Sequence, residues 1–372
     1  MTIIIILVGI YSFFILVFII GFHKVKKNEL PERYQRSTPF SIIVPFRNEA
    51  KSLPALLESI NALNYSTSLC EFIFVDDYSK DEGATIISSF ASTSKFRIHL
   101  IKSNRKTASP KKDAISTAIK KSNYQWIITI DADCTFNEMW LNCYDYYIQN
   151  NNVDFLASSV SFSGKDTFLD SFQILENMSL HTVTLGGFGI EKPMMCNGAN
   201  MTYKKEVFIA LNGFTGNDHI ASGDDIFLMQ KAINSSYTVK FLKSPDAVVT
   251  TQTESSISQL ISQRKRWTSK TSGYKNWFTT CIALNTLLGN LSILACFLIL
   301  FMSTTNLVLC TSVIVLKFLV DSLCIITTAN YFKQYKPLKH LLLSLFIYPV
   351  WTVYIALISV NKSYTWKGRL LR

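Results

Sequence analysis

"YQWIITIDADC", residues 124–134, combines a short apolar run with two acids. The run at 126–130 is rich in residues that favour strands, and such runs are typical of a strand buried on both faces. Asp131 and Asp133 follow it directly. The same arrangement recurs in "CEFIFVDDYSKD", residues 70–81, where Asp76 and Asp77 end the apolar run. We therefore expect two buried strands that present acids at their carboxyl ends.

The flanking sequence extends this pattern. In "FSIIVPFRNE", residues 40–49, a strand ends at a proline, and "AKSLPALLESINAL", residues 50–63, has helical spacing. A weaker strand is expected in "FRIHLIKS", residues 96–103. Strands that alternate with helices favour an α/β fold with a mostly parallel sheet flanked by helices. Ligands of such sheets bind beyond the carboxyl ends of the strands, so one cleft is expected to hold several of the carboxylates.

The composition adds a membrane component. The chain has 372 residues, of which 48% are hydrophobic, and a positive mean hydropathy. Residues 2–22 carry no charge and are long enough to cross about 30 Å of hydrocarbon as a helix. We expect the following organisation: a transmembrane helix at 1–22, a globular domain at 38–255, an amphipathic interfacial helix at 256–275, two or three transmembrane helices within 279–360, and a basic tail at 361–372.

The charges predict an orientation and exclude one class of partner. "HKVKKNELPERYQR" follows the first span, so the positive-inside rule places the globular domain in the cytoplasm, on a multi-pass protein of the cell membrane. Eight cysteines without ordered spacing agree with a reducing compartment. The net charge of +11 comes without any nucleic-acid motif and clusters beside membrane segments. Anionic lipid headgroups are the simpler partner, and no nucleic acid is expected.

The C-terminal third leaves the number of spans open. Segments near 281–302, 306–328 and 339–360 would make four spans with the first, and would place the basic tail outside. Its lysines and arginines favour the inside instead. Pro349 offers a solution, because the last segment could be bent or re-entrant. Lys317 and Asp321, four residues apart, are expected either to pair within the bilayer or to line an acceptor path.

Carboxylates crowded in a cleft repel each other unless a cation joins them. The D-x-D pattern of Asp131 and Asp133 can present oxygen atoms to a divalent metal, and we expect Mg²⁺ or Mn²⁺, which need few protein ligands when a substrate phosphate is present. The alternative is that these acids only end a strand and cap the next helix.

The order of the motifs resembles that of the family 2 inverting glycosyltransferases, which have the nucleotide-sugar-binding GT-A fold. "IIVPFRNE" resembles the family's opening strand and loop, "FVDDYSKD" its V-D-D-G-S-x-D element, and "IDADC" its metal-binding D-x-D. "PKKDAISTAIKKS" is similar to its lysine-containing helix, with Pro110 in place of a glycine. "CNGANMTYKKEVFIALNGF" resembles the acceptor-side segment, "SGDDIFLMQKA" the E-D-x-x-L helix, and "QRKRW" the Q-x-x-R-W motif. The resemblance covers roughly residues 40–270.

This resemblance implies a role for each matched residue. It implies nucleotide-sugar binding by Pro45, Arg47, Glu49, Asp77, Lys111 and Asp131; metal binding by Asp133 with Asp131; acceptor binding by Asn197, Asn200, Asp224, Gln263 and Trp267; and catalysis by Asp225 and Arg266. In this scheme Asp225 takes the proton of the acceptor hydroxyl. The alternative for "SGDD" is a helix N-terminus with acids that the helix dipole favours.

The "QRKRW" stretch can serve two purposes at once. On a helix, Gln263, Arg266 and Trp267 share one face. Arg266 would then stabilise the departing pyrophosphate. Arg264 and Lys265 lie off that face, so we expect them to meet lipid headgroups.

We therefore expect a membrane glycosyltransferase that moves a sugar from a nucleoside-diphosphate sugar, a UDP-sugar in particular, to a lipid or lipid-linked acceptor. This chemistry would belong to cell-envelope polysaccharide or glycolipid biosynthesis. A processive polysaccharide synthase is the alternative, although the short C-terminal membrane region leaves little material for an export channel. A catalytically inactive binding protein is the third possibility, which the intact Asp133, Asp225 and Arg266 oppose.

Overall fold

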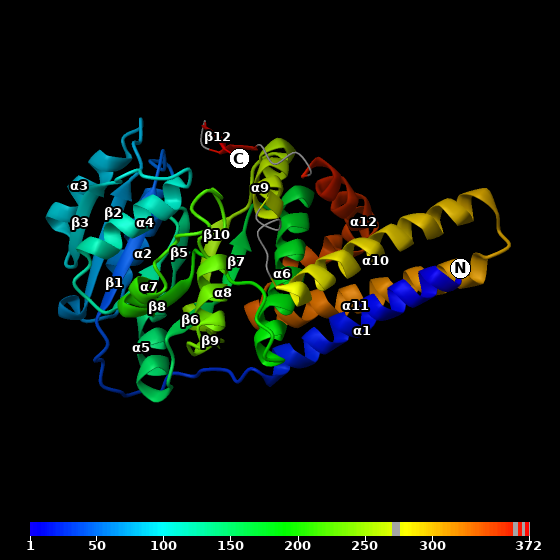
Figure 1. The fold of residues 1–372 in the computed structure, drawn as a ribbon, viewed down its shortest axis with the longest axis horizontal. Helices are drawn as coiled ribbons and strands as arrows, with labels where there is room; N and C mark the ends of the chain where they lie inside the picture. Colours follow the sequence, from blue (N-terminus) through cyan, green and yellow to red (C-terminus); the bar gives the residue numbers. More distant parts are fainter. Residues whose placement is uncertain (270–275, 360–363, 367–368, 372) are drawn as a thin grey trace. The chain divides into compact units, whose positions relative to one another are not determined.

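The computed structural model describes residues 1–269, 276–359, 364–366 and 369–371 (Figure 1). Its contacts divide the chain into two units. The helical unit comprises Met1–Val25, Phe162–Met194 and Thr253–Tyr364, and the sheet unit comprises Lys26–Ser161, Met195–Gln252 and Thr365–Arg372. The expected globular domain at 38–255 is thus not continuous, because residues 162–194 group with the terminal helices. Parts of the expected interfacial helix (270–275) and basic tail (361–363, 367–368, 372) lie outside the described residues.

A seven-stranded sheet of order β3-β2-β1-β4-β8-β6-β9 forms the core of the sheet unit. The pairs β1–β2, β2–β3, β1–β4 and β6–β9 are parallel, while β8 runs antiparallel to both β4 and β6. The expected mostly parallel sheet is therefore confirmed. The strand bounds are β1 Phe40–Phe46, β2 Cys70–Asp76, β3 Arg97–Lys102, β4 Trp126–Thr129, β6 Phe155–Ser158, β8 Met201–Lys204 and β9 Val239–Leu242.

Helices connect the parallel strands and cover the sheet. α4 packs against β1 and β2, and α3 packs against β3 (Figure 1). The helices of this unit are α2 Leu53–Ala62, α3 Gly83–Thr93, α4 Pro110–Lys121, α5 Trp140–Asn150, α7 Lys205–Ala210 and α8 Ile226–Asn234, with short 3-10 turns η1 Thr67–Leu69 and η2 Pro245–Ala247. A second sheet has the order β5-β10-β7, with bounds β5 Cys134–Phe136, β10 Val249–Gln252 and β7 Val160–Ser163.

The sheet opens beside β1, and Pro45 lies at the opening. β1 pairs with β2 along its whole length, but with β4 only from Phe40 to Ile43. Pro45 has no backbone N–H to donate, so it is tolerated where one neighbouring strand has already ended. The chain passes from β1 to β2 and β3 on one side, and β4 lies on the other. Such a reversal of strand order is where open α/β sheets bind ligands.

Among the residues that the structure describes, the helical unit contains four helices that are long and apolar enough to cross a membrane: Thr2–Lys24, Trp277–Met302, Leu307–Phe332 and Lys336–Ile358. The spans expected from the sequence are thus present as helices. α1 (Thr2–Lys24) packs against α10 (Trp277–Met302) and α11 (Leu307–Phe332) (Figure 1). The remaining elements are α6 Phe168–Gly189, α9 Ile257–Ser269, η4 Lys336–His340 and α12 Leu341–Ile358, which continues through Pro349.

Glycines allow α1 and α6 to cross closely. A Cβ added to Gly21 would lie 2.3 Å from the backbone oxygen of Gly186, and one added to Gly186 would lie 2.2 Å from that of Phe18. At Gly189 the distance to the backbone oxygen of Gly21 would be only 1.8 Å. Any side chain at these positions would push the backbones apart. Small residues serve the same purpose where helices meet inside membranes.

Two substitutions on α1 test this crossing. Gly21→Ala should lower the melting temperature of the purified chain in detergent, since overpacking costs about 1–3 kcal/mol. Gly9→Ala is the matched control, because an added Cβ at Gly9 meets nothing within 4 Å. It should leave the melting temperature unchanged or raise it, as alanine favours a helix by up to about 1 kcal/mol. Equal melting temperatures for the two variants would contradict the close crossing.

Candidate functional site

Lys111 joins two acids that come from distant parts of the sequence. It lies in the first turn of α4, which begins at Pro110, and proline suits that position because its missing N–H has no partner there anyway. Its Nζ lies 2.7 Å from Asp131 Oδ1, just after β4, and 3.1 Å from Asp224 Oδ2, just before α8. The ammonium therefore holds together the loop after β4 and the loop before α8.

The charge of Lys111 is secured by these neighbours. Burial by itself would lower the pKa of the ammonium, but Asp131 and Asp224, with a smaller contribution from Asp225, more than offset it. The pKa of Lys111 is therefore raised above its ordinary value. Lys111 remains a cation throughout the physiological pH range.

Asp131 and Asp133 offer oxygen atoms to a metal. The Asp131 side chain is 39% exposed, and since Lys111 binds its Oδ1, Oδ2 remains for another cation. Asp133 is exposed and accepts a weak S–H bond from Cys134 at 3.6 Å. Within the described ranges, no group of three or more His, Cys, Asp or Glu side chains could hold a metal without a substrate. One or two carboxylates completed by substrate phosphates are a donor set that fits Mg²⁺ or Mn²⁺.

Asp225 caps helix α8. Its Oδ1 accepts a hydrogen bond from the backbone N–H of Ile226 at 2.7 Å, and its Oδ2 accepts one from Gly198 at 3.3 Å. The alternative considered for "SGDD", a helix N-terminus with favourable acids, thus describes its local structure. Both carboxylate oxygens of Asp225 thus accept backbone N–H groups, which hold its side chain in place at the start of α8.

Gly198 allows the acidic groups to approach its backbone. A Cβ at this position would lie 2.7 Å from Asp224 Oδ2 and 3.4 Å from both Lys111 Nζ and the Asp225 Cβ. The glycine in the sequence "CNGAN" is therefore required by space. The segment at 196–200 and the "SGDD" segment meet at this point.

Asn200, which was expected to bind the acceptor, has a structural role in the core. Asn200 is fully buried, and its side-chain amide donates to the backbone oxygens of Ser159 and Ala247. Its Oδ1 accepts hydrogen bonds from Trp140 and Tyr144. The expectation that Asn200 contacts the acceptor is wrong, because its hydrogen-bonding groups are all used inside the core. Asn197 is half-buried and accepts a bond from the backbone N–H of Ala199.

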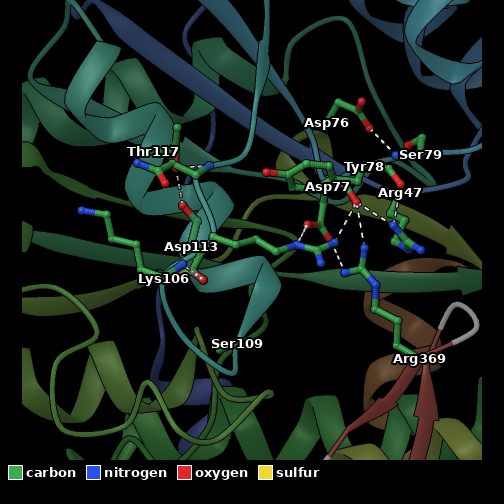
Figure 2. Close-up of polar contacts among 12 residues, drawn as sticks. Arg47, Asp76, Asp77, Tyr78, Ser79, Lys106, Ser109, Asp113, Thr117 and Arg369 are labelled. Atoms are coloured by element: carbon green, nitrogen blue, oxygen red, sulfur yellow. Dashed lines mark hydrogen bonds and ion pairs between the residues drawn. The ribbon is translucent and has the colours of Figure 1, made fainter.

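Three arginines surround Asp77 at the carboxyl end of β2 (Figure 2). Its backbone oxygen accepts bonds from Arg47 at 2.8 Å, Arg369 at 3.0 Å and Arg105 at 3.3 Å. Its carboxylate pairs with Arg105 through Oδ1 and with Arg369 through Oδ2. Burial raises the pKa of the Asp77 carboxyl, and Arg105 and Arg47 oppose that shift only in part. Asp77 and Arg47, both expected at the nucleotide pocket, therefore lie together.

The loops around Asp77 have an unusual backbone. Asn48 and Tyr78 adopt positive φ angles of 52° and 57°. The two loops also bond each other, since the backbone N–H of Lys80 donates to Asn48 Oδ1 and that of Asn48 donates to Ser79 Oγ. Residues in this region of φ cluster at binding sites that the surrounding structure holds in place. Pro45 and Glu49, also expected at this pocket, lie half-buried on β1 and on its following loop.

Arg105, in the loop after β3, was not among the site residues expected from the sequence. Asp113 fixes this loop: its Oδ2 accepts the backbone N–H groups of Lys106 and Thr107, both at 2.8 Å (Figure 2). Arg105 stacks on the Tyr78 ring, with its guanidinium carbon 4.5 Å from the ring centroid. The one available signal was its place after β3, next to β2 in a parallel sheet. No local signal pointed to Arg369.

The Q-x-x-R-W residues lie on α9 in the helical unit. Gln263 donates to Glu254 at 2.8 Å, and Trp267 packs against Phe162, with ring centroids 6.4 Å apart. The Arg264 guanidinium lies over the Trp267 ring, 4.1 Å from its centroid. Arg266 is half-buried, in the last turn of the helix.

Arg264 does not face lipid headgroups, and that expectation is wrong. Only 4% of its side chain is exposed, and it pairs with Glu176 of α6 through Nε at 2.8 Å and Nη2 at 2.7 Å. Glu176 also accepts a bond from the Trp351 ring N–H of α12 at 3.2 Å. The helical periodicity correctly predicted that Arg264 and Arg266 lie on different faces of α9. The face that carries Arg264 is covered by α6. No sequence pattern indicated α6 as its partner.

These elements define an α/β fold of the GT-A type, with terminal helices that could span a membrane. Residues 41–211 match the family described as Glycosyl transferase family 2. This part of the chain is therefore similar to glycosyltransferase family 2 domains. The fold is also that of the mannosyltransferase PcManGT from Pyrobaculum calidifontis, solved in complex with GDP-Man and Mn²⁺. The two share 17% identity and a TM-score of 0.55, over 97% of this chain and 98% of that one.

Curated relatives are also glycosyltransferases by name. Glycosyltransferase AglE of Haloferax volcanii is 24% identical over 55% of this chain and 64% of its own length. Undecaprenyl-phosphate 4-deoxy-4-formamido-L-arabinose transferase of Photorhabdus laumondii is 35% identical over 27% of this chain and 30% of its own length. The similarity thus spans less than two thirds of either relative.

The pair between Arg264 and Glu176 gives a testable prediction. Arg264→Ala should lower the free energy of unfolding by about 3–5 kcal/mol, because it leaves a buried carboxylate without its cation. Lys265→Ala deletes the same charge one position later and should change stability by less than about 1 kcal/mol. Thermal unfolding of both variants in detergent measures the difference. Matching transitions for the two variants would show that the pair has no structural role.

Proposed function

We propose that this chain is a membrane-bound glycosyltransferase. It moves a sugar from a nucleoside-diphosphate sugar, a UDP-sugar in particular, to a hydroxyl of a lipid or lipid-linked acceptor, with inversion at the anomeric carbon. The observation that carries the proposal is the bridge from Asp131 through Lys111 to Asp224. It joins the D-x-D acids to the segment that the family resemblance assigns to the acceptor.

The donor side uses the carboxyl ends of the parallel strands. Asp77, as an acceptor of hydrogen bonds, would receive an N–H of the base or an O–H of the ribose. Lys111 is held as a cation beside Asp131, where it would stabilise the negative charge that develops on the diphosphate. We assign Arg266 a similar role on the strength of the Q-x-x-R-W motif, because its planar guanidinium suits phosphate oxygens.

The acceptor side needs a base. As the acceptor oxygen forms its bond to the anomeric carbon, its proton passes to Asp225, and the bond from that carbon to the diphosphate breaks with its electron pair on the departing nucleotide. Attack from the face opposite the leaving group inverts the anomeric carbon. Gly198 and the helix N-terminus hold Asp225 in position through their N–H groups.

Asp133 and Asp131 would hold a divalent metal between the protein and the donor phosphates. When bound, Mg²⁺ or Mn²⁺ supplies positive charge for the leaving diphosphate. The exposed carboxylate of Asp133 and the partly exposed one of Asp131 support this assignment. The Mn²⁺ in the complex of the mannosyltransferase with the same fold supports it as well.

Two observations support a lipid acceptor at a cell membrane. The helical unit has four helices able to cross a bilayer, and one curated relative is named as an undecaprenyl-phosphate arabinose transferase. The lysines and arginines after α1 support a cytoplasmic sheet unit.

Asp225→Asn tests the base. Asparagine also caps helices well, so the variant should keep its fold. It cannot take a proton at neutral pH, and we expect turnover to fall by at least about 10²-fold, the lower end of what general-base catalysis supplies. Calorimetry with UDP should show unchanged donor affinity. A loss of UDP affinity with normal turnover at saturating donor would instead assign Asp225 to the nucleotide pocket.

Asp133→Ala tests the metal site. The variant should lose both transfer and the Mn²⁺-dependent part of UDP binding, because one of few protein oxygens for the metal is removed. Purified protein in detergent, with labelled donor sugars and lipid extracts as acceptor, measures transfer, and the length of the product separates single transfer from processive synthesis. Unchanged activity with metal dependence retained would remove Asp133 from the site.

A further inference from the structure

A residue near the C-terminus, Arg369, contacts Asp77, the acid that follows β2. Arg369 is the first residue of β12 (Arg369–Leu371), and its Nη1 lies 2.5 Å from Asp77 Oδ2 (Figure 2). Its Nη2 lies 3.0 Å from the Asp77 backbone oxygen. Arg105 Nε holds the other carboxylate oxygen at 2.8 Å. Both oxygens of the carboxylate expected to bind the nucleotide are thus engaged by arginines.

Donors exceed acceptors around Asp77. Its backbone oxygen has two lone pairs but is approached by N–H groups of Arg47, Arg105 and Arg369. One guanidinium can therefore leave while the carbonyl stays fully hydrogen-bonded. The departure of Arg369 would also free Oδ2 of the carboxylate.

Of the three arginines, Arg369 is carried by the least supported segment of backbone. Arg47 is itself buried, and Arg105 belongs to the loop that Asp113 fixes. The strand β12 pairs with β11 (Tyr364–Trp366) in a sheet of two three-residue strands. Two-stranded sheets of this kind are marginally stable in water, so Arg369 is the group that a ligand would displace.

We propose that β12 is a latch on the nucleotide pocket: Arg369 holds the Asp77 carboxylate while the pocket is empty and leaves it when a nucleotide binds. The inference rests on the proposed function, since it takes Asp77 as a nucleotide-binding residue. A carboxylate can only accept hydrogen bonds, so the ligand must bring an N–H of the base or an O–H of the ribose. Arg369 and the nucleotide therefore compete for the same oxygen, and the latch lowers the apparent affinity by the fraction of molecules in which it is open.

The latch has a consequence for the membrane topology. Because Arg369 and Asp77 are in contact, both lie on the same side of a membrane. The chain between the end of β10 and β11 must then cross an even number of times, although three of its helices could span. The third candidate span, Lys336–Ile358, has 23 residues against 26 each for α10 and α11, and it contains Pro349. We therefore assign this segment, which ends in α12, as the one that does not cross completely.

Nucleotide binding to the full-length chain in detergent tests the competition. By calorimetry with UDP and Mn²⁺, Arg369→Ala should bind UDP about 3- to 10-fold more tightly than the natural chain, as expected for a latch that is closed most of the time. Arg369→Lys keeps the charge but loses the two-pronged contact, and should show a smaller gain. Lys27→Ala removes the same charge from an exposed pair with Glu29 in the same unit and should leave the affinity unchanged. Unchanged or weaker UDP binding by Arg369→Ala would overturn the latch.

Hydrogen exchange supplies a second readout. Addition of UDP should speed exchange of the backbone amides at 364–366 and 369–371, because the strand pair loses its contact with Asp77. Slower exchange there would mean that the tail closes over the nucleotide, and would also overturn the proposal.

Asp77→Asn distinguishes a failure of the proposed donor site from a failure of the latch. If UDP binding does not depend on Asp77, the proposed donor site itself fails; if it does and Arg369→Ala gains nothing, only the latch fails.

The sidedness is tested in sealed vesicles with a membrane-impermeant maleimide. Cysteine replaces Arg369 in one variant and the exposed Lys80, on the loop after β2, in another, with Cys281 and Cys196 changed to serine in both. Both new cysteines should be labelled from the same side. Labelling from opposite sides would overturn the latch together with the assignment of α12.

Discussion

The site depends on the two ion pairs that the ammonium group of Lys111 makes. This ammonium lies between Asp131 and Asp224, with Asp225 close by. Without a cation there, the two loops that carry these acids would repel each other at the distance that Gly198 permits. The acids in turn raise the pKa of Lys111 and keep it charged. The loop after β4 and the loop before α8 thus depend on one another, which explains how segments far apart in the sequence form one centre.

The architecture around Lys111 was largely predictable, because it follows from periodicity and strand ends. Apolar runs that end in acids predicted β2 and β4, and the parallel connection brought Asp77 and Asp131 to one edge of the sheet. The strand that was expected to end at Pro45 instead continues to Phe46, although it loses its β4 neighbour after Ile43. The apolar helices at both ends were equally readable from composition. These features are local, so no knowledge of distant contacts was needed.

Side chains whose surroundings come from elsewhere in the chain were not predictable. The motif around Asn200 suggested a residue of the acceptor pocket, but Trp140 and Tyr144 donate hydrogen bonds to its side chain inside the core. The basic residues around Arg264 suggested contact with lipid headgroups, but Arg264 pairs with Glu176 of α6 instead. Arg105 and Arg369 reach Asp77 through a loop and a C-terminal strand that no periodicity describes. In each case the decisive partner is far away in sequence, and burial by that partner overrides the local pattern.

The most direct test of the central claim is a structure of the full-length chain with UDP and Mn²⁺, with the metal located by its anomalous signal. The account predicts Mn²⁺ bound to a carboxylate oxygen of Asp133, Lys111 still between Asp131 and Asp224, and the nucleoside on Asp77. A metal bound away from both Asp131 and Asp133, or a nucleotide that leaves Asp77 untouched, would contradict it.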